Sequence, residues 1–412
     1  MMKLAAKLDL VTLRAIPRGV WALGLVSLFM DISSEMIHAI LPIYLVTVLG
    51  TSTLMVGIIE GVAEATASIT KVFSGALSDW LGKRKLLAVI GYGLAAFTKP
   101  IFPLASTVGW LVAARFIDRV GKGIRGAPRD ALVADIAPVH LRAASFGLRQ
   151  SLDTIGAFVG PMLAIGLMLI TANSFTTVFW IAVIPGFIAF ALIAFAVSEP
   201  HRPAGLRQVK FPLQREEIKR LSVAFWLVVA VAAMFTLARF SEAFLVLKAQ
   251  AVGLPIALVP LVMVLMNVVY AFAAYPAGVF AEGDGGRTRV LVIGLVFLIV
   301  ADVVLALSTH VWMTLIGVAF WGLHMGMTQG LLATLIADAA PPELRGTAFG
   351  LFNLVTGIAL LFASVFAGVL WDSFGPQATF LVGAGFTALS LLGFLVLQRW
   401  QISSSAKVGT EK

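Results

Sequence analysis

The stretch Gly75-Ala76-Leu77-Ser78-Asp79-Trp80-Leu81-Gly82-Lys83-Arg84 has a second copy later in this chain. Two glycines, one acidic residue and one arginine recur with the same spacing: Gly75, Asp79, Gly82 and Arg84 return as Gly278, Glu282, Gly285 and Arg287. A second pair of stretches repeats at the same offset, in which Asp135 and Arg142 return as Asp338 and Arg345. Because one offset fits both without a gap, the chain is predicted to be a duplicated unit whose copies form two structural halves.

The composition indicates that a lipid bilayer surrounds these halves. The 412 residues are 60% hydrophobic and 12% charged, whereas ordinary soluble domains contain about 25% charged residues. Cysteine is absent, which excludes disulfides and thiolate metal sites. Many membrane transporters are built from duplicated halves, around a site that opens alternately to either side.

Apolar stretches of about 20 residues, enough to cross a ~30 Å hydrocarbon core, follow one another along the whole chain. We predict twelve helices, six in each half, over residues 20–48, 53–78, 85–106, 108–136, 144–170, 176–198, 222–248, 254–280, 289–307, 311–336, 346–370 and 377–399. The predicted fold is therefore an all-α membrane protein with two pseudo-symmetric six-helix bundles.

The predicted domain boundaries follow from these spans. A polar and charged stretch that contains prolines separates the two bundles and is typical of a linker. The predicted parts are an N-terminal segment 1–19, an N-terminal bundle 20–198, a linker 199–221, a C-terminal bundle 222–399 and a tail 400–412.

The distribution of positive charge predicts the orientation. Loops on the side of the N-terminus contain most of the 30 Lys and Arg residues, while the opposite loops contain Lys248 alone. Because Lys and Arg accumulate in cytoplasmic loops, we expect a multi-pass protein of the bacterial cytoplasmic (inner) membrane with both termini in the cytoplasm. The same asymmetry explains the net charge of +9 without a nucleic-acid partner. No cleavage site follows a short apolar core, so a removable signal peptide is not expected.

Charged residues inside the predicted helices are the candidates for chemistry, because each isolated charge at mid-membrane costs about 2.5–3.5 kcal/mol. Steps of three or four residues place one set on a single face of helix 108–136: Arg115, Asp118, Arg119, Lys122, Arg125 and Arg129. Carboxylates at similar spacing occur in the first two helices, namely Asp31 with Glu35 and Glu60 with Glu64.

These charges allow two interpretations. The basic stripe can bind an anionic substrate or attract the carboxylates, and paired carboxylates can share a proton. Alternatively, the charges form a purely structural ion-pair network, an interpretation that weighs most for Arg125, Arg129 and Asp130. A cationic solute would compete with the proton and be exchanged for it, whereas an anionic solute would travel with the proton. In the second half, Asp302 has no obvious local partner.

Other kinds of site find no support in the sequence. The five histidines are scattered and no carboxylate–histidine spacing repeats, so no metal is expected. No glycine-rich loop suited to phosphates is present, which argues against an ATP-driven pump. Neither a cofactor nor an enzymatic activity is therefore expected.

The loop between the second and third helices, Gly75 to Lys85, resembles the signature loop of the major facilitator superfamily, and Gly278 to Arg289 is similar to its weaker second copy. Trp80 stands where the family usually has arginine. Gly156, Gly160 and Pro161 resemble the helix-5 motif of the antiporters in this family, although Ala164 and Ile165 replace its final glycine pair. Arg115 precedes Asp135 as the arginine of the family's helix-4 motif does.

The resemblance covers essentially the whole chain and implies specific roles for the repeated motif. It implies a gate, with Asp79 linking the two halves when the site is open to the outside. The residues assigned to this gate are Gly75, Asp79, Gly82, Arg84, Asp135, Arg142, Gly278, Glu282, Arg287, Asp338 and Arg345. Lys83, Arg84 and Lys85 would also anchor the turn to the anionic inner leaflet.

We therefore predict a secondary transporter in which two bundles rock around a midplane site. The helix-5 motif favours proton-coupled antiport, which means efflux, and the basic stripe favours a solute with a negative group. The predicted partners are this small solute, protons and the bilayer, with a monomer as the functional form. The alternatives are a proton-coupled symporter that takes up an organic anion, and a receptor or scaffold of the same fold that transports nothing.

Overall fold

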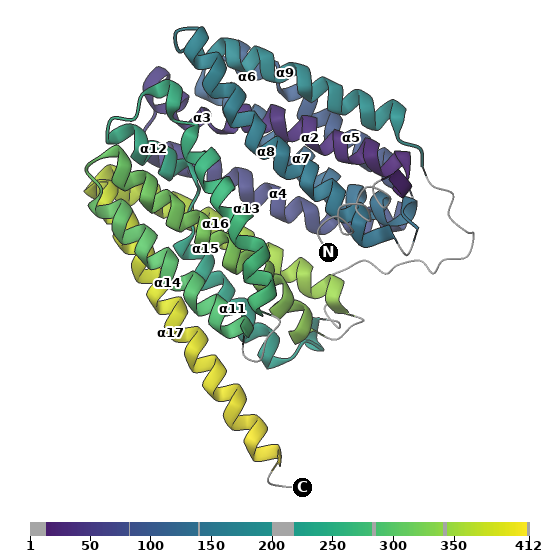
Figure 1. Cartoon of the computed structure of the whole chain (residues 1–412), viewed down its shortest axis with the longest axis vertical. Helices are drawn as coiled ribbons and strands as arrows, with labels where there is room; N and C mark the ends of the chain where they lie inside the picture. The colour runs from purple at the N-terminus through teal and green to yellow at the C-terminus, as the bar shows by residue number, and fades with distance from the viewer. Residues whose placement is uncertain are drawn as a thin grey trace, which may run out of the picture. The chain divides into compact units, whose positions relative to one another are not determined.

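The computed structural model describes residues 14–81, 83–138, 141–199, 218–281, 286–340 and 344–409. These residues form twelve helical passages, several of them interrupted, and contain no strand (Figure 1). Eleven of the passages are long and apolar enough to cross a membrane. The remaining passage, α7 (Val108–Ile136), is as long as its neighbour α8 but contains the charged stripe. The prediction of an all-α membrane protein is confirmed.

The first half of the chain supplies six of these passages. In order they are α2 (Arg18–His38) with α3 (Leu41–Ile43) and η1 (Tyr44–Val48), α4 (Thr53–Leu81), α5 (Arg84–Thr98) with α6 (Ile101–Leu104), α7, α8 (Arg142–Ile170), and α9 (Phe175–Ala191) with η3 (Leu192–Ala196). Prolines accompany two of the interruptions: Pro42 is the second residue of α3, and Pro100 directly precedes α6. Proline is favoured at a helix start because the first turn does not use its missing N–H.

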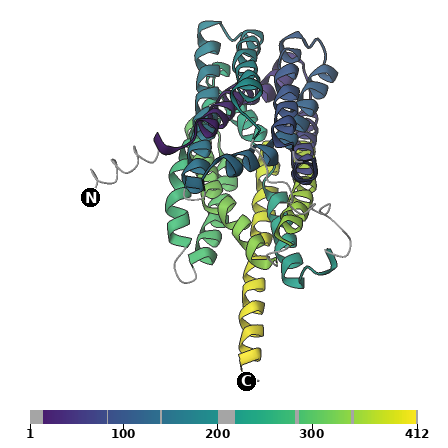
Figure 2. The same ribbon diagram turned by 90° about the vertical axis from the view of Figure 1, so that its right-hand side faces the viewer.

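The second half supplies the other six. They are α11 (Val223–Ala238) with α12 (Ala243–Ala251), α13 (Leu261–Ala281) preceded by the short η4 (Ile256–Leu258), α14 (Gly286–Leu307), α15 (Val311–Ala339), α16 (Arg345–Phe374) and α17 (Pro376–Gly409). The predicted span 377–399 is the apolar part of α17, which continues to Gly409 beyond the other helices of this half (Figures 1 and 2).

One predicted helix, 222–248, is broken in the structure between Ala238 and Ala243. Within the break, the backbone N–H of Ser241 donates to the hydroxyl of Ser364 at 3.2 Å, and the Ser241 hydroxyl accepts from the backbone N–H of Ala243 at 3.2 Å. Serine side chains can replace helical hydrogen bonds in this way, which explains how the break is stabilised.

The contacts divide the chain into two compact units. Unit 1 comprises residues 1–49, 66–212 and 256–261, and unit 2 comprises residues 50–65, 213–255 and 262–412. Helix α4 is therefore shared, since Thr53–Ala65 groups with unit 2 and Thr66–Leu81 with unit 1. The domain boundaries expected from the sequence stay a prediction.

The α4 segment in unit 2 is fixed at its N-terminus by a carboxylate of α16. Oxygen Oδ1 of Asp372 accepts from the Thr53 N–H at 3.1 Å and Oδ2 accepts from the Leu54 N–H at 2.8 Å, while the Thr53 hydroxyl also donates to Oδ1. The first N–H groups of a helix lack helical partners, and the helix dipole favours an anion there. Asp372 thus caps a helix from which it is far removed in sequence.

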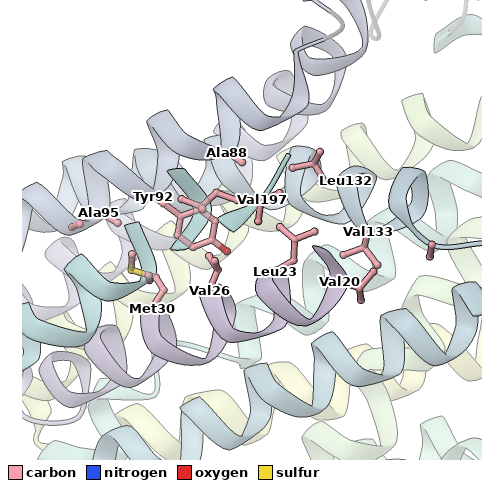
Figure 3. Packing of buried hydrophobic residues seen from close by; sticks show 14 of the residues in the cluster. Val20, Leu23, Val26, Met30, Ala88, Tyr92, Ala95, Leu132, Val133 and Val197 are labelled. Carbon is pink, nitrogen blue, oxygen red and sulfur yellow. The ribbon is translucent and has the colours of Figure 1, made fainter. Parts of the chain in front are cut away.

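The core of unit 1 joins the helices α2, α5, α7 and α9 with η3 and the segment after it (Figure 3). Leu23, Val26 and Met30 of α2 are fully buried against Tyr92 of α5, and Val197 packs beside them. Between membrane helices, association depends on close van der Waals packing rather than on a hydrophobic driving force. Small residues therefore matter in this core.

Helices α5 and α7 approach each other closely at a pair of glycines. A Cβ atom added at Gly91 would lie 2.7 Å from the Gly121 carbonyl oxygen, and one added at Gly121 would lie 2.6 Å from the Gly91 carbonyl oxygen. Both values are shorter than any real Cβ contact. The two glycines allow the backbones to touch, and this contact holds the charged helix α7 in place.

We predict that Gly91→Ala and Gly121→Ala each lower the stability of the folded protein by about 1–3 kcal/mol, because the added methyl group must push two backbones apart. The measurement is thermal unfolding of the purified protein in detergent. The matched control is Gly166→Ala in α8, where an added Cβ meets nothing within 4 Å. The control should be neutral or stabilising, because alanine favours helix. Equal effects at all three positions would contradict the proposed contact.

Candidate functional site

Two glycines of α8 bring that helix against the predicted carboxylates of α2. A Cβ added at Gly156 would lie 2.9 Å from the Cβ of Asp31, and one added at Gly160 would lie 2.8 Å from the Cβ of Glu35. Larger residues would separate the helices at both carboxylates. Pro161 lies inside α8 next to Gly160, where it removes one backbone donor from the helix. The helix-5 motif and the α2 carboxylates, predicted separately, thus meet at one seam.

Asp31 is paired with another carboxyl group across this seam. The carboxyl groups of Asp31 and Asp153 are close enough to act on each other electrostatically. Two acids this close repel each other when both are ionised, so the arrangement favours a state in which one of them holds a proton. On its other side, Asp153 lies 3.5 Å from a guanidinium nitrogen of Arg129 and 3.5 Å from one of Arg149.

Glu35 lies one turn further along α2, among basic side chains. Its Oε2 is 3.5 Å from Nδ1 of His38, and both Lys122 and Arg119 are close enough to act on it electrostatically. Lys122 is exposed whereas Arg119 is buried. The structure therefore places Asp31, Glu35, Arg119 and Lys122 near one another in unit 1, while their role as a site stays a prediction.

A buried ion pair lies beside this group. Nζ of Lys99 is 3.0 Å from Oδ1 of Asp118 and donates to the Ser34 hydroxyl at 3.0 Å, with side-chain exposures of 2% and 3% for Lys99 and Asp118. The Arg119 Nε is 4.0 Å from the other carboxyl oxygen of Asp118. Sequence analysis did not assign Lys99 to the site. The signal that could have found it is its position before Pro100, where the interruption between α5 and α6 leaves Lys99 facing inward.

The remaining bases of the stripe have different surroundings. Arg125 is buried with its guanidinium 4.9 Å from the centre of the Tyr92 ring, an attractive cation–π distance. Arg115 is also buried and acts on Asp118 electrostatically. Arg129 donates to the Ser27 hydroxyl at 3.1 Å and to Asp130 at 3.1 Å. For Arg125, Arg129 and Asp130 these contacts favour the structural interpretation.

The first copy of the gating motif is partly assembled in unit 1. Arg84 pairs with Asp135 at 2.8 Å and donates to the Ala131 carbonyl at 2.8 Å, and Arg142 donates to the Ala134 carbonyl at 3.2 Å. Glu199 caps α5, since its carboxylate accepts from the N–H groups of Arg84 and Lys85 at 2.8 Å each. Sequence analysis placed Glu199 in the linker and missed this role.

Several predicted gate residues lie outside the part of the chain that the structure describes. The described part of the chain does not include Gly82 and Glu282, nor the side chains of Asp79, Asp338 and Arg345. Of the described glycines, Gly75 approaches α7, since an added Cβ would lie 3.3 Å from the Cβ of Ala127, whereas one at Gly278 would meet nothing within 4 Å. Arg287 lies at the start of α14. The gate itself stays a prediction.

The second carboxylate pair belongs to the shared helix. Glu60 is fully buried and Glu64 half-buried, both in the segment of α4 that groups with unit 2. Their part in the site stays a prediction. Among the described residues, no group of three or more His, Cys, Asp or Glu could hold a metal ion.

Comparisons with known proteins agree on one family. The sequence model of the Major Facilitator Superfamily matches residues 23–247 and 238–411. An MFS-type transporter of Methanocaldococcus jannaschii is 33% identical over 93% of this chain and 95% of its own length. The inner membrane transport protein YajR of Escherichia coli is 25% identical over 91% of this chain and 82% of its own length. The crystal structure of a D-xylose–proton symporter superposes with a TM-score of 0.73 at 16% identity, covering 91% of this chain and 96% of that one. At that identity the superposition supports the fold.

The Lys99–Asp118 contact predicts a non-additive pair of substitutions. Removing one partner of a buried ion pair costs about 3–5 kcal/mol because the other charge stays buried. We expect Asp118→Asn to cost this much, and Lys99→Met to cost less, because Arg119 remains beside Asp118. The double variant should lose less stability than the sum of the single variants. Thermal unfolding in detergent measures all three, with Lys219→Met at an exposed position as the control. Strict additivity would show that the two charges do not interact.

Proposed function

The chain belongs to the Major Facilitator Superfamily and is a membrane transporter, and on this premise we propose that it exchanges protons for a solute that carries a negative group. Membership confirms the family recognised in the sequence, and the members compared are transporters rather than enzymes. The proposal adds the coupling ion, the direction and the class of solute.

The Asp31–Asp153 pair is the observation that supports proton coupling. Two carboxyl groups close enough to repel each other can hold one proton between them, and the pair lies at the seam between α2 and α8. Asp31 is half-buried rather than sealed, so solvent or a solute can reach it. Coupled carboxyl groups bind and release protons as a unit.

The neighbouring bases support a solute with a negative group. Lys122 is exposed beside Glu35, and the buried Arg119 stands behind it. An anionic group that approaches Lys122 gains a charge-assisted contact. If the rest of the solute occupies the Asp31–Asp153 pair, it displaces the shared proton, and solute and proton then exclude each other. Mutual exclusion at one site is what antiport requires.

Symport is the second candidate, and the same Lys122 contact favours it. A solute that binds Lys122 without reaching Asp31 would withdraw the positive charge from Glu35, and Glu35 would then take up a proton together with the solute. The direction of solute-induced proton movement separates the two modes, because antiport and symport move the proton in opposite directions relative to the solute.

The test is solute-induced proton movement in proteoliposomes that contain the purified protein and a pH-sensitive dye, with organic anions, cations and zwitterions as probes. We expect an anion or zwitterion to move protons in the wild type, and Glu35→Gln and Lys122→Gln to reduce that flux at least about tenfold, since each removes a charged hydrogen-bonding partner. Lys219→Gln makes the same chemical change at an exposed position and should behave as wild type.

Two results would contradict the proposal. Solute uptake without any proton movement would rule out proton coupling while the chain remains a transporter. If Glu35→Gln and Lys122→Gln both leave the proton movement unchanged, proton coupling stands but the coupling site lies elsewhere in the chain.

We also propose that both termini face the cytoplasm of a bacterial inner membrane, which the positions of Lys and Arg support. The absence of cysteine makes a direct test simple. In intact cells, Asn173→Cys, in an exposed turn, should react with a membrane-impermeant thiol reagent, and Lys83→Cys should react only after permeabilisation. The reverse pattern would invert the orientation.

A further inference from the structure

Unit 2 contains a buried acid for which the proposed mechanism has no use. Asp302 lies in α14, less than two turns before the helix ends at Leu307. Its exposure is 0%, and neither carboxyl oxygen has a hydrogen-bond partner among the described residues. Asp118 in unit 1 is buried to a similar degree, since 2% of the whole residue is exposed, but it is paired with Lys99. The two buried aspartates therefore have opposite surroundings.

An aromatic ring lies beside Asp302. A Cβ added at Gly383 of α17 would lie 3.0 Å from Oδ2 of Asp302 and 3.1 Å from the Phe240 ring, so carboxyl group and ring are neighbours. The Phe240 ring centre lies 5.6 Å from that of Trp321 and 5.5 Å from that of Phe380. The apolar carbon of the Phe240 ring cannot replace the hydration of a negative charge.

The charged and titratable groups of the neighbouring elements are few and are occupied elsewhere. Helix α15 contributes His310 and His324, the break between α11 and α12 contributes Arg239 and Glu242, α12 contributes Lys248, and the described side chains of α17 contribute none. His324 contacts the Gly294 carbonyl at 2.9 Å, more than two turns from Asp302 along α14. Lys248 donates to the Ser308 carbonyl at 2.9 Å.

From this geometry we propose that Asp302 is a proton-binding site of unit 2, occupied in the conformation described here. At neutral pH, keeping an isolated carboxylate ionised in an apolar interior costs more free energy than binding a proton to it. Such groups therefore become protonated. Ionisable residues buried within membrane-spanning helices are expensive to keep and commonly mark proton pathways.

The adjacent helix break gives this proton a route for exchange. Phe240, the ring beside Asp302, belongs to the non-helical residues between α11 and α12. Its backbone can move without breaking a continuous run of helical hydrogen bonds, and its displacement would admit water to the carboxyl group. That this proton is the one coupled to the solute rests on the proposed function, whereas the binding of the proton does not.

Infrared spectroscopy of the purified protein in lipid at neutral pH tests the site with the proton alone as ligand. A protonated carboxyl group has a carbonyl stretching band separate from the bands of carboxylates. We expect Asp302→Asn to lose one such band from the wild-type spectrum. Asp372→Asn, the same change at an exposed carboxylate of unit 2, should lose none. The band of the Asp31–Asp153 pair should persist in both variants.

A second variant keeps the test decisive if Asp302→Asn does not fold. Gly383→Ala places a methyl group against Oδ2 of Asp302 and should shift the same band, while Gly385→Ala, where an added Cβ meets nothing within 4 Å, should leave it unchanged. A spectrum that neither Asp302→Asn nor Gly383→Ala alters would overturn the proposal.

The two proposals can fail separately. An Asp302 band in a protein whose solute transport moves no protons would retain the proton site and overturn proton coupling. Proton-coupled transport by a protein that lacks the band would retain the proposed function and overturn the assignment of Asp302.

Discussion

A charge inside a membrane-spanning helix needs a partner, and this constraint organises the structure of unit 1. The charged stripe makes helix α7 less apolar than the other eleven passages, which are apolar enough to cross a membrane. It is stable among them because its charges find partners on other helices, such as Lys99 of α5 for Asp118. Single charges would be costly in this setting, while pairs with good geometry are tolerated.

Glycine makes these pairings geometrically accessible. At Gly91 and Gly121 the backbones of α5 and α7 touch, and at Gly156 and Gly160 α8 comes against α2 beside Asp31 and Glu35. A charge pair needs its atoms within about 3–4 Å, which helices separated by larger side chains could not provide for the short aspartate side chain. The small residues and the charged residues of unit 1 therefore depend on each other.

The duplication preserved the helices and changed their chemistry. In unit 1, acids and bases form a network that includes an exposed lysine and two neighbouring carboxyl groups, Asp31 and Asp153. In unit 2, the described part of α14 places one acid, Asp302, beside the ring of Phe240. The same helical architecture thus supports two ways of holding an ionisable group in a membrane: neutralisation by an opposite charge and, as proposed for Asp302, neutralisation by a proton.

The sequence by itself determined the duplication, the twelve helical passages and the family, because hydropathy and local motifs follow from residues close together in the chain. It also placed Asp31 and Glu35 on one turn, since helical spacing is local. The tertiary structure decided which helix each charge meets. Asp31 meets Asp153 of α8 as well as Glu35 on its own helix, and Asp118 pairs with Lys99, a residue that the site prediction omitted. Spacing defines a face of a helix, but the partner of that face depends on how distant helices pack.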